Sequence, residues 1–119
     1  MATIKQSMEE LMTCDGALCA ALVDSVSGMV LGSIGSGVDM EIAAAGNTEV
    51  VRAKVKTMRD LGLNDTIEDI LITLGKHYHI IRPMARKEGL FIYLVLDKAK
   101  SNLALARRKT VDVEKELTL

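Results

Sequence analysis

Two short segments contain apolar residues at nearly every position, Ala17–Val23 and Leu90–Leu96. Successive side chains of a β-strand point to opposite faces of its sheet, so a strand of this kind is buried only if both faces are covered. We therefore expect both segments to be central strands of a sheet with helices against its two faces. This requirement limits the choice of fold more than any other feature of the sequence.

The other elements follow from apolar spacing and turn residues. Helical spacing predicts three helices, Ile4–Thr13, Asp39–Leu61 and Lys98–Leu117. Apolar runs bounded by turn residues predict three further strands, Met29–Ile34, Thr66–Leu74 and His77–Met84.

Short polar motifs mark several ends of these helices. Thr3 and Gln6 have the spacing of a capping box, and Asp97 is expected to cap the last helix. Gly62 is expected to end the middle helix, with Leu63 packing back on Met58.

The element order is helix, two strands, helix, three strands, helix. Short connections favour antiparallel pairing, and helices must cover the sheet. The expected class is α+β, with a three-layer α/β/α sandwich around a central five-stranded antiparallel sheet. The chain has 119 residues, a single Pro and no low-complexity linker, so we expect one domain spanning residues 1–119.

The middle helix is apolar over an unusually wide arc. At about 100° per residue its apolar residues span roughly 200°, whereas an ordinary surface helix has a stripe of ~100°. They form two adjacent strips, Ala43, Gly46, Val50, Ala53 and Leu61, and Ala44, Val51, Val55 and Met58. One strip can pack on the sheet, and a second copy of the chain is the simplest cover for the other. The alternative is that the other two helices flank this one.

The candidate dimer interface combines this helix with the strand that follows it. Its residues are Asn47, Val50, Val51, Lys54, Val55, Met58, Ile70 and Ile72. Asn47 and Lys54 lie inside the arc and need polar partners if buried, so they are candidates for fixing the register of the dimer. Replacing Val55 by Glu is expected to disrupt the dimer.

Composition excludes several classes of partner. The chain has 15 basic and 16 acidic side chains, whereas non-specific nucleic-acid binders usually show a strong basic excess. No apolar run approaches the ~20 residues of a membrane span. Met1–Glu10 is typical of an amphipathic helix and not of a signal peptide. We therefore expect a cytoplasmic protein that neither binds nucleic acid nor spans a membrane.

No motif indicates catalysis, a metal or a cofactor. Cys14 and Cys19 have no zinc-site pattern and are expected to be reduced and partly buried. His77 and His79 share one strand face, but no third ligand is evident, so a solvated face is the preferred interpretation. The loop Gly32–Gly37 lacks the spacing of a phosphate loop. We expect no catalytic, metal or cofactor residues, although side chains that meet only in the folded chain cannot be recognised from sequence.

Four segments together resemble the Roadblock/dynein light chain family. They are the turn Val23–Leu31, the strand residues Tyr78–Pro83, the strand Gly89–Asp97 and the helix residues Ser101–Arg107. The run Asn-Leu-Ala-Leu-Ala-Arg in the last segment is typical of bacterial members, including those that resemble the gliding-motility regulator. The resemblance extends over essentially the whole chain.

The resemblance implies a profilin-like sheet with the first and fifth strands in the middle. It implies homodimers or heterodimers, formed through Asp39–Leu61 and Thr66–Leu74, in which two sheets become continuous. It also implies that the dimer binds and regulates a small Ras-like GTPase, without an active site of its own, and that another Roadblock-type protein is a possible partner.

Two alternative functions stay open at this stage. A small-molecule sensor can have the same architecture, but such domains usually enclose a pocket with large side chains. One Phe and two Tyr in the chain argue against that. The other alternative is a structural scaffold subunit, which binds partners without changing their activity.

Overall fold

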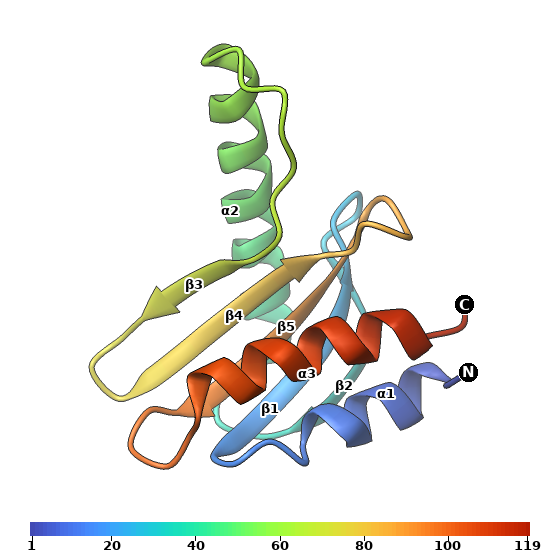
Figure 1. Cartoon of the computed structure of the whole chain (residues 1–119), viewed down its shortest axis with the longest axis vertical. Helices are drawn as coiled ribbons and strands as arrows, with labels where there is room; N and C mark the ends of the chain where they lie inside the picture. Colours follow the sequence, from blue (N-terminus) through green and yellow to red (C-terminus); the bar gives the residue numbers. More distant parts are fainter.

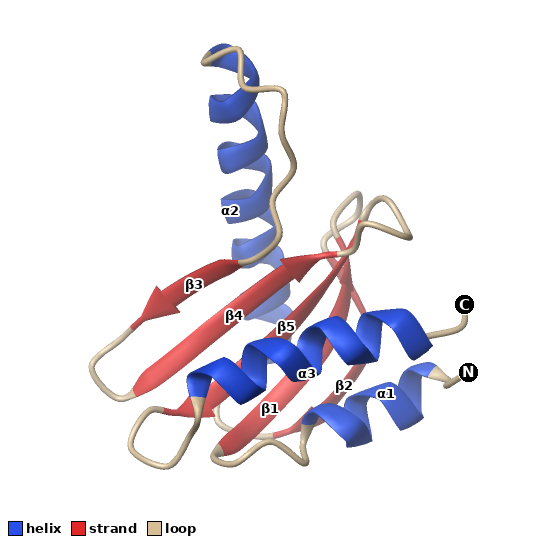
Figure 2. Cartoon of the chain, in the orientation of Figure 1, coloured by secondary structure: helices blue, strands red, loops and turns tan.

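A five-stranded sheet with the order β2-β1-β5-β4-β3 forms the middle layer of the protein. The computed structural model describes residues 1–119. Its elements in chain order are α1 (Ile4–Leu11), β1 (Ala17–Asp24), β2 (Met29–Gly35), α2 (Met40–Asp60), β3 (Ile70–Thr73), β4 (His77–Pro83), β5 (Leu90–Asp97) and α3 (Leu103–Glu116). All neighbouring strands are antiparallel. Helices α1 and α3 cover one face and α2 lies on the other (Figure 1; Figure 2), which confirms the predicted α+β sandwich.

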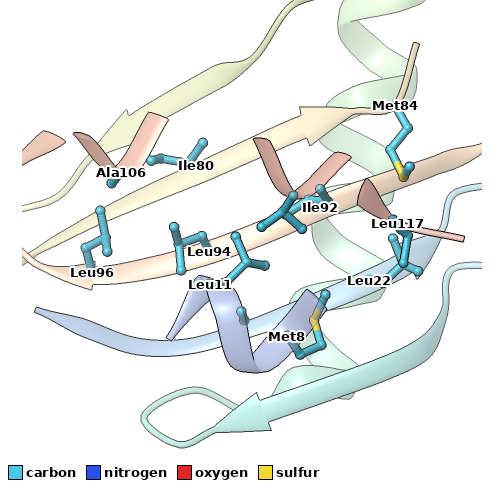
Figure 3. Close-up of a cluster of buried hydrophobic side chains, with 12 residues drawn as sticks. Met8, Leu11, Leu22, Ile80, Met84, Ile92, Leu94, Leu96, Ala106 and Leu117 are labelled. Carbon is cyan, nitrogen blue, oxygen red and sulfur yellow. The ribbon is translucent and has the colours of Figure 1, made fainter. Parts of the chain in front are cut away.

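The two apolar segments are adjacent strands, as expected. β1 and β5 pair from Ala17 opposite Leu96 to Asp24 opposite Leu90. Their alternating side chains divide between two cores. The core under α1 and α3 (Figure 3) includes Met8, Leu11, Leu22, Ile92, Leu94, Leu96 and Val113. The core under α2 includes Cys19, Ala21, Val23, Ala44, Val51, Ile81, Phe91, Tyr93 and Val95.

Local motifs place the start of α1 and the end of α2 as predicted, whereas α1 ends at Leu11 and not at Thr13. The backbone N–H of Gln6 donates to Thr3 Oγ1 over 3.1 Å, and the N–H of Thr3 donates to Gln6 Oε1 over 3.0 Å. Gly62 follows α2 with a φ of 72°, which a glycine adopts without a Cβ clash. The N–H of Leu63 then donates to the carbonyl of Met58 over 2.9 Å, as in a Schellman motif.

Strand β3 begins at Ile70 and not at Thr66, so the predicted start was wrong. Ile70 lies opposite Ile81, and continuing this register would place Glu68 opposite Pro83. Pro83 has no N–H for the ladder. The Nη1 of Arg82 instead donates to the carbonyl of Glu68 over 3.1 Å, which takes that oxygen away from strand pairing.

The last helix begins at Leu103, and Asn102 caps it instead of Asp97. Asn102 Oδ1 accepts a hydrogen bond from the N–H of Leu105 over 3.1 Å. The Asp97 carboxylate accepts from the N–H of Ala99 over 2.9 Å and closes a turn. The predicted start at Lys98 was therefore wrong, because residues 98–102 form a turn and a loop before the helix begins at Leu103.

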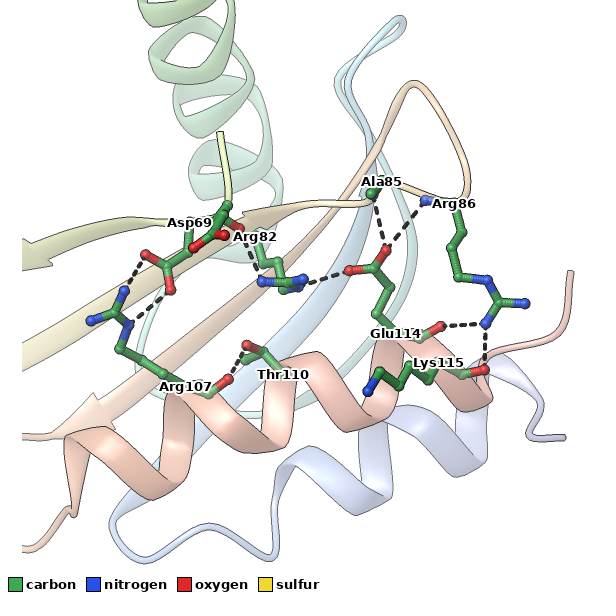
Figure 4. A network of polar contacts seen from close by, with 9 residues as sticks. Asp69, Arg82, Ala85, Arg86, Arg107, Thr110, Glu114 and Lys115 are labelled. Atoms are coloured by element: carbon green, nitrogen blue, oxygen red, sulfur yellow. Dashed lines mark hydrogen bonds and ion pairs between the residues drawn. The ribbon is translucent and has the colours of Figure 1, made fainter. Parts of the chain in front are cut away.

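A buried carboxylate joins α3 to the end of β4 (Figure 4). Glu114 is 4% exposed, and its Oε1 accepts from Arg82 Nε over 2.7 Å. Its Oε2 accepts from the N–H groups of Ala85 and Arg86 over 2.9 and 3.3 Å. This network fixes the segment after β4 against the helix layer.

The helices of the protein are amphipathic elements of the three layers. None of them has the length and hydropathy together that a bilayer crossing requires.

Candidate protein interaction surface

Helix α2 is the only helix on its face of the sheet (Figure 1). Helices α1 and α3 pack on the opposite face, so they do not flank α2 and that alternative is wrong. The residues of α2 that are buried, Ala44, Thr48 and Val51, all lie in its first half or near its middle. The second half projects past the sheet, and its ribbon stands clear of the strands in Figure 1.

The two apolar strips of α2 have different surroundings. Ala44 and Val51 pack on the sheet, but further along the same strip Val55 is 40% exposed. On the second strip, Val50 is 37% exposed and Leu61 is 65% exposed. Apolar side chains along a large part of the helix are thus uncovered in the single chain, which is unusual for an isolated protein of this size.

Strand β3 is the second part of the candidate interface. It pairs with β4 on one side only, so its outer backbone groups form an open edge. Ile70 and Ile72 are half-buried and pack toward the core under α2. We call the combination of the outer flank of α2 and the β3 edge the α2/β3 surface; its residues are Asn47, Val50, Lys54, Val55, Ile70 and Ile72.

The remaining two residues of the predicted interface have other environments. Val51 is 8% exposed and packs between α2 and the sheet. Met58 is half-buried and lines a hollow beneath the projecting half of the helix.

Two arginines hold the residues that directly precede β3 (Figure 4). Arg107 of α3 binds both carboxylate oxygens of Asp69, with distances of 2.8 and 2.9 Å from its Nε and Nη2. Arg82 holds the carbonyl of Glu68. Because these contacts come from the helix layer and from β4, the edge strand is already ordered before any partner binds.

A polar cluster lies under the first half of α2. The hydroxyl of Tyr93 and Nδ1 of His79 are 2.9 Å apart and share a hydrogen bond. Burial raises the pKa of Tyr93, although a hydrogen bond with Asn47 opposes the increase. Burial also lowers the pKa of His79, with a smaller contribution from the charge of His77. The Nε2 of His79 is buried and no protein group bonds to it.

The histidine pair therefore differs from its predicted environment. His77 and His79 do share a face, and their rings stack with centroids 5.6 Å apart. However, His79 packs against the edge of Tyr93, so the interpretation as a solvated strand face was wrong for this residue. No three His, Cys, Asp or Glu side chains come close enough together to hold a metal ion.

A hollow of about 600 Å³ opens beneath the projecting half of α2. Its walls are that half of the helix, the chain that leads to β3, and the turn between β4 and β5. Its apolar lining includes Val51, Val55, Met58, Leu63, Ile67, Met84, Leu90 and Phe91. Sequence reasoning missed this feature, because it depends on how far α2 extends beyond the sheet.

Comparisons with known proteins identify the fold. A scan against family models gives no match, and a search of curated proteins gives none either. The Roadblock/LC7 domain from Streptomyces avermitilis matches with a TM-score of 0.82 at 13% identity, covering 96% of this chain and 93% of that chain. Myxococcus xanthus MglB gives a TM-score of 0.82 at 18% identity, covering 95% of this chain and 89% of that chain.

A third solved structure agrees with these two. The gliding protein MglB from Thermus thermophilus gives a TM-score of 0.74 at 17% identity, covering 95% of this chain and 89% of that chain. The chain thus has the fold of the Roadblock/LC7 domain and of the MglB proteins, and the predicted resemblance is confirmed at the level of the fold.

Proposed function

We propose that this chain is a homodimeric interaction module that binds and regulates a small Ras-like GTPase and has no active site of its own. In this proposal residues 1–119 act as one domain. The observation that carries it is the α2/β3 surface, which combines an uncovered apolar helix flank with an open strand edge. The same surface also suits another Roadblock-type chain, so heterodimers belong to the proposal.

A two-fold dimer uses both parts of this surface at once. Pairing of β3 with its counterpart in a second copy would join the two sheets, and the α2 helices would pack side by side. Such an arrangement would cover Val50 and Val55, and it would give Asn47 and Lys54 polar partners at the seam. Two-fold dimers of identical chains are the commonest soluble oligomers, and their interfaces must be self-complementary in this way.

The substitution Val55→Glu tests the dimer. It places a charge where the proposed seam is apolar, and an unpaired buried charge is strongly unfavourable. The wild-type chain of 12.9 kDa should show twice that mass by light scattering, and the variant should show the monomer mass. Val26→Glu is the matched control, because Val26 is 75% exposed in the β1–β2 turn and is not one of the residues of the α2/β3 surface. Only its backbone carbonyl, which the substitution keeps, contacts α2, through Arg52.

Both valines are partly solvent-exposed in the single chain, so neither substitution should unfold it. Circular dichroism checks this directly. If Val55→Glu is a folded dimer like the Val26→Glu control, the proposed face is wrong.

The GTPase part of the proposal rests on the sequence resemblance together with the shared fold. A small Ras-like GTPase from the same organism is the test partner. We expect it to co-purify with the wild-type dimer, and its GTP hydrolysis rate to change when the dimer is added. Binding without a change of rate would favour the structural scaffold, and no binding to any such GTPase would refute this part and leave the dimer intact.

The hollow beneath α2 favours a second candidate, a small-molecule sensor. Its volume of about 600 Å³ lies in the range of ligand pockets, and its lining is partly apolar. A thermal-shift screen with nucleotides and metabolites tests this, since a bound ligand stabilises the folded state by mass action. A saturable stabilisation that Ile67→Glu abolishes would support the sensor, because Ile67 lines the hollow and is not a residue of the α2/β3 surface.

A further inference from the structure

Strand β3 receives little support from the chain that leads into it. Residues 61–69 connect the end of α2 to β3 without forming a helix or a strand, and most of them are exposed. The strand itself has only 4 residues. At its far end the N–H of Leu74 donates to the carbonyl of His77 over 2.8 Å and closes the turn to β4. The near end has no such turn, so its position depends on side-chain contacts made around Asp69.

Asp69, directly before β3, is held from the side of the sheet that faces away from α2. Ile70 and Ile72 pack toward the core under α2, whereas Leu71 packs toward the core under α1 and α3. Asp69 reaches the α3 side as well, where both of its carboxylate oxygens bind Arg107 (Figure 4). The Asp69 side chain is only 11% exposed. We call this ion pair the clamp.

The clamp is the direct contact by which α3 holds the start of β3. Bidentate pairs between arginine and a carboxylate are stronger and geometrically more specific than single ion pairs. Arg82 supports the same segment from β4, because its Nη1 holds the carbonyl of Glu68 while its Nε binds the buried Glu114. Contacts on the α3 side thus fix a strand whose Ile70 and Ile72 belong to the α2/β3 surface.

We propose that Arg107 is a positioning residue for dimerisation, which holds β3 through the clamp in the conformation that a second copy pairs with. This inference rests on the proposed α2/β3 dimer, and it names a residue outside that surface that sets the affinity of the dimer. Without the clamp, the start of β3 has to become ordered when the second copy binds. That ordering costs conformational entropy and weakens the complex.

The effect enters the dissociation constant twice, because both chains of the dimer must present an ordered β3. An apparent dissociation constant equals the intrinsic value divided by the fraction of the chain that is competent to bind. If loss of the clamp reduces this fraction to about a third in each chain, the dissociation constant rises about tenfold.

The substitution Arg107→Gln tests the proposal, because glutamine cannot form the charged bidentate pair. Analytical ultracentrifugation across a dilution series should give a dimer dissociation constant about tenfold above that of the wild type. Lys109→Gln is the matched control. Lys109 lies on the same helix, and its Nζ forms an ion pair with Glu10 of α1 over 2.7 Å. This control removes the same charge and an ion pair between two elements, and it should dimerise like the wild type.

Asp69→Asn shows whether Arg107 acts through the clamp. Alone, it should weaken the dimer about as much as Arg107→Gln does. The double variant should weaken the dimer little further, since either change breaks the same contact. Full additivity of the two effects would overturn the proposal, because Arg107 and Asp69 would then act separately.

Hydrogen exchange in the Val55→Glu background separates positioning from a general loss of stability. When Arg107→Gln is added, the β3 amides that pair with β4 should exchange faster, whereas the amides of β5 should keep their rates. Equal acceleration in β3 and β5 would overturn the positioning role, because the substitution would then only destabilise the whole fold.

The possible results distinguish the clamp from the dimer on which it depends. A wild-type protein that stays monomeric at all concentrations would overturn the α2/β3 dimer, and the role of Arg107 with it. A wild-type dimer with the same dissociation constant as Arg107→Gln would overturn the role of Arg107 alone and leave the dimer intact.

Discussion

His79 lies between the β3 edge and the buried strand β5, under the helix that forms the candidate surface. One ring nitrogen bonds to the Tyr93 hydroxyl, and the other is buried without a protein partner. The positive charge of His77 also lowers the pKa of His79, because two like charges close together repel. The surroundings of His79 thus favour the neutral ring, so its pKa is lower in the folded protein.

This shift makes stability depend on pH. The unfolded chain binds a proton at His79 near the ordinary pKa of about 6.5, whereas the folded chain resists it. The contribution to stability is therefore complete above that pH, and it is lost as the pH falls below it through the lower pKa of the folded state. We predict that the urea midpoint of the wild type decreases below pH ~6.5 more steeply than that of His79→Asn.

Asparagine suits this test because its side chain keeps a polar atom near Tyr93 and does not titrate. His77→Gln is the control and should keep most of the slope, because burial of His79 is the larger cause. Equal slopes for wild type and His79→Asn would contradict the assigned role of His79.

At the residue scale, the sequence pattern predicted which residues share a face of a strand. It did not predict which side chains of other elements pack against that face. The shared face of His77 and His79 follows from their spacing by two. The contact with Tyr93 depends on the register between β4 and β5, which no local pattern specifies. For the same reason, Val51 and Val55 were assigned to one strip correctly, although one is buried on the sheet and the other lies beyond it.

At the element scale, local sequence determines where some helices begin, and tertiary contacts determine where others begin. The capping box of α1 was predicted because both of its residues lie within one turn. For α3, both Asp97 and Asn102 are residues that favour an N-cap position. A tertiary contact decides between them: the N–H of Asp97 donates to the carbonyl of Gly16 over 2.7 Å, which holds Asp97 at the end of β5.

This assignment predicts the effect of removing the cap. Asn102→Ala should lower the free energy of unfolding by about 1 kcal/mol, because the N–H of Leu105 loses its acceptor. Asn102→Asp should retain most of the stability, since its carboxylate can accept the same bond. Chemical denaturation measures both, and an unchanged midpoint for Asn102→Ala would show that the cap contributes nothing.

The whole architecture was predictable because it depends on few requirements. Two all-apolar strands needed cover on both faces, and three amphipathic helices were available to provide it. The interaction surfaces were only partly predictable. The wide arc of α2 identified a helix with two apolar sides, but the projection of α2 and the hollow arise from how the elements end relative to one another.

The projection of α2 leads to a prediction for the assembled molecule. Few contacts within the chain hold the helix from Ala53 to Asp60, where nearly every residue is exposed. Segments with few buried contacts open at low free-energy cost, and binding a second copy stabilises them by mass action. Amide hydrogen exchange in this part of α2 should therefore speed up when wild-type protein is diluted, and should be fast at all concentrations in Val55→Glu. The amides of β5, buried at the centre of the sheet, should exchange slowly in both proteins. Slow, concentration-independent exchange along α2 in both would mean that the chain supports this helix alone, and the dimer would lose its main physical reason.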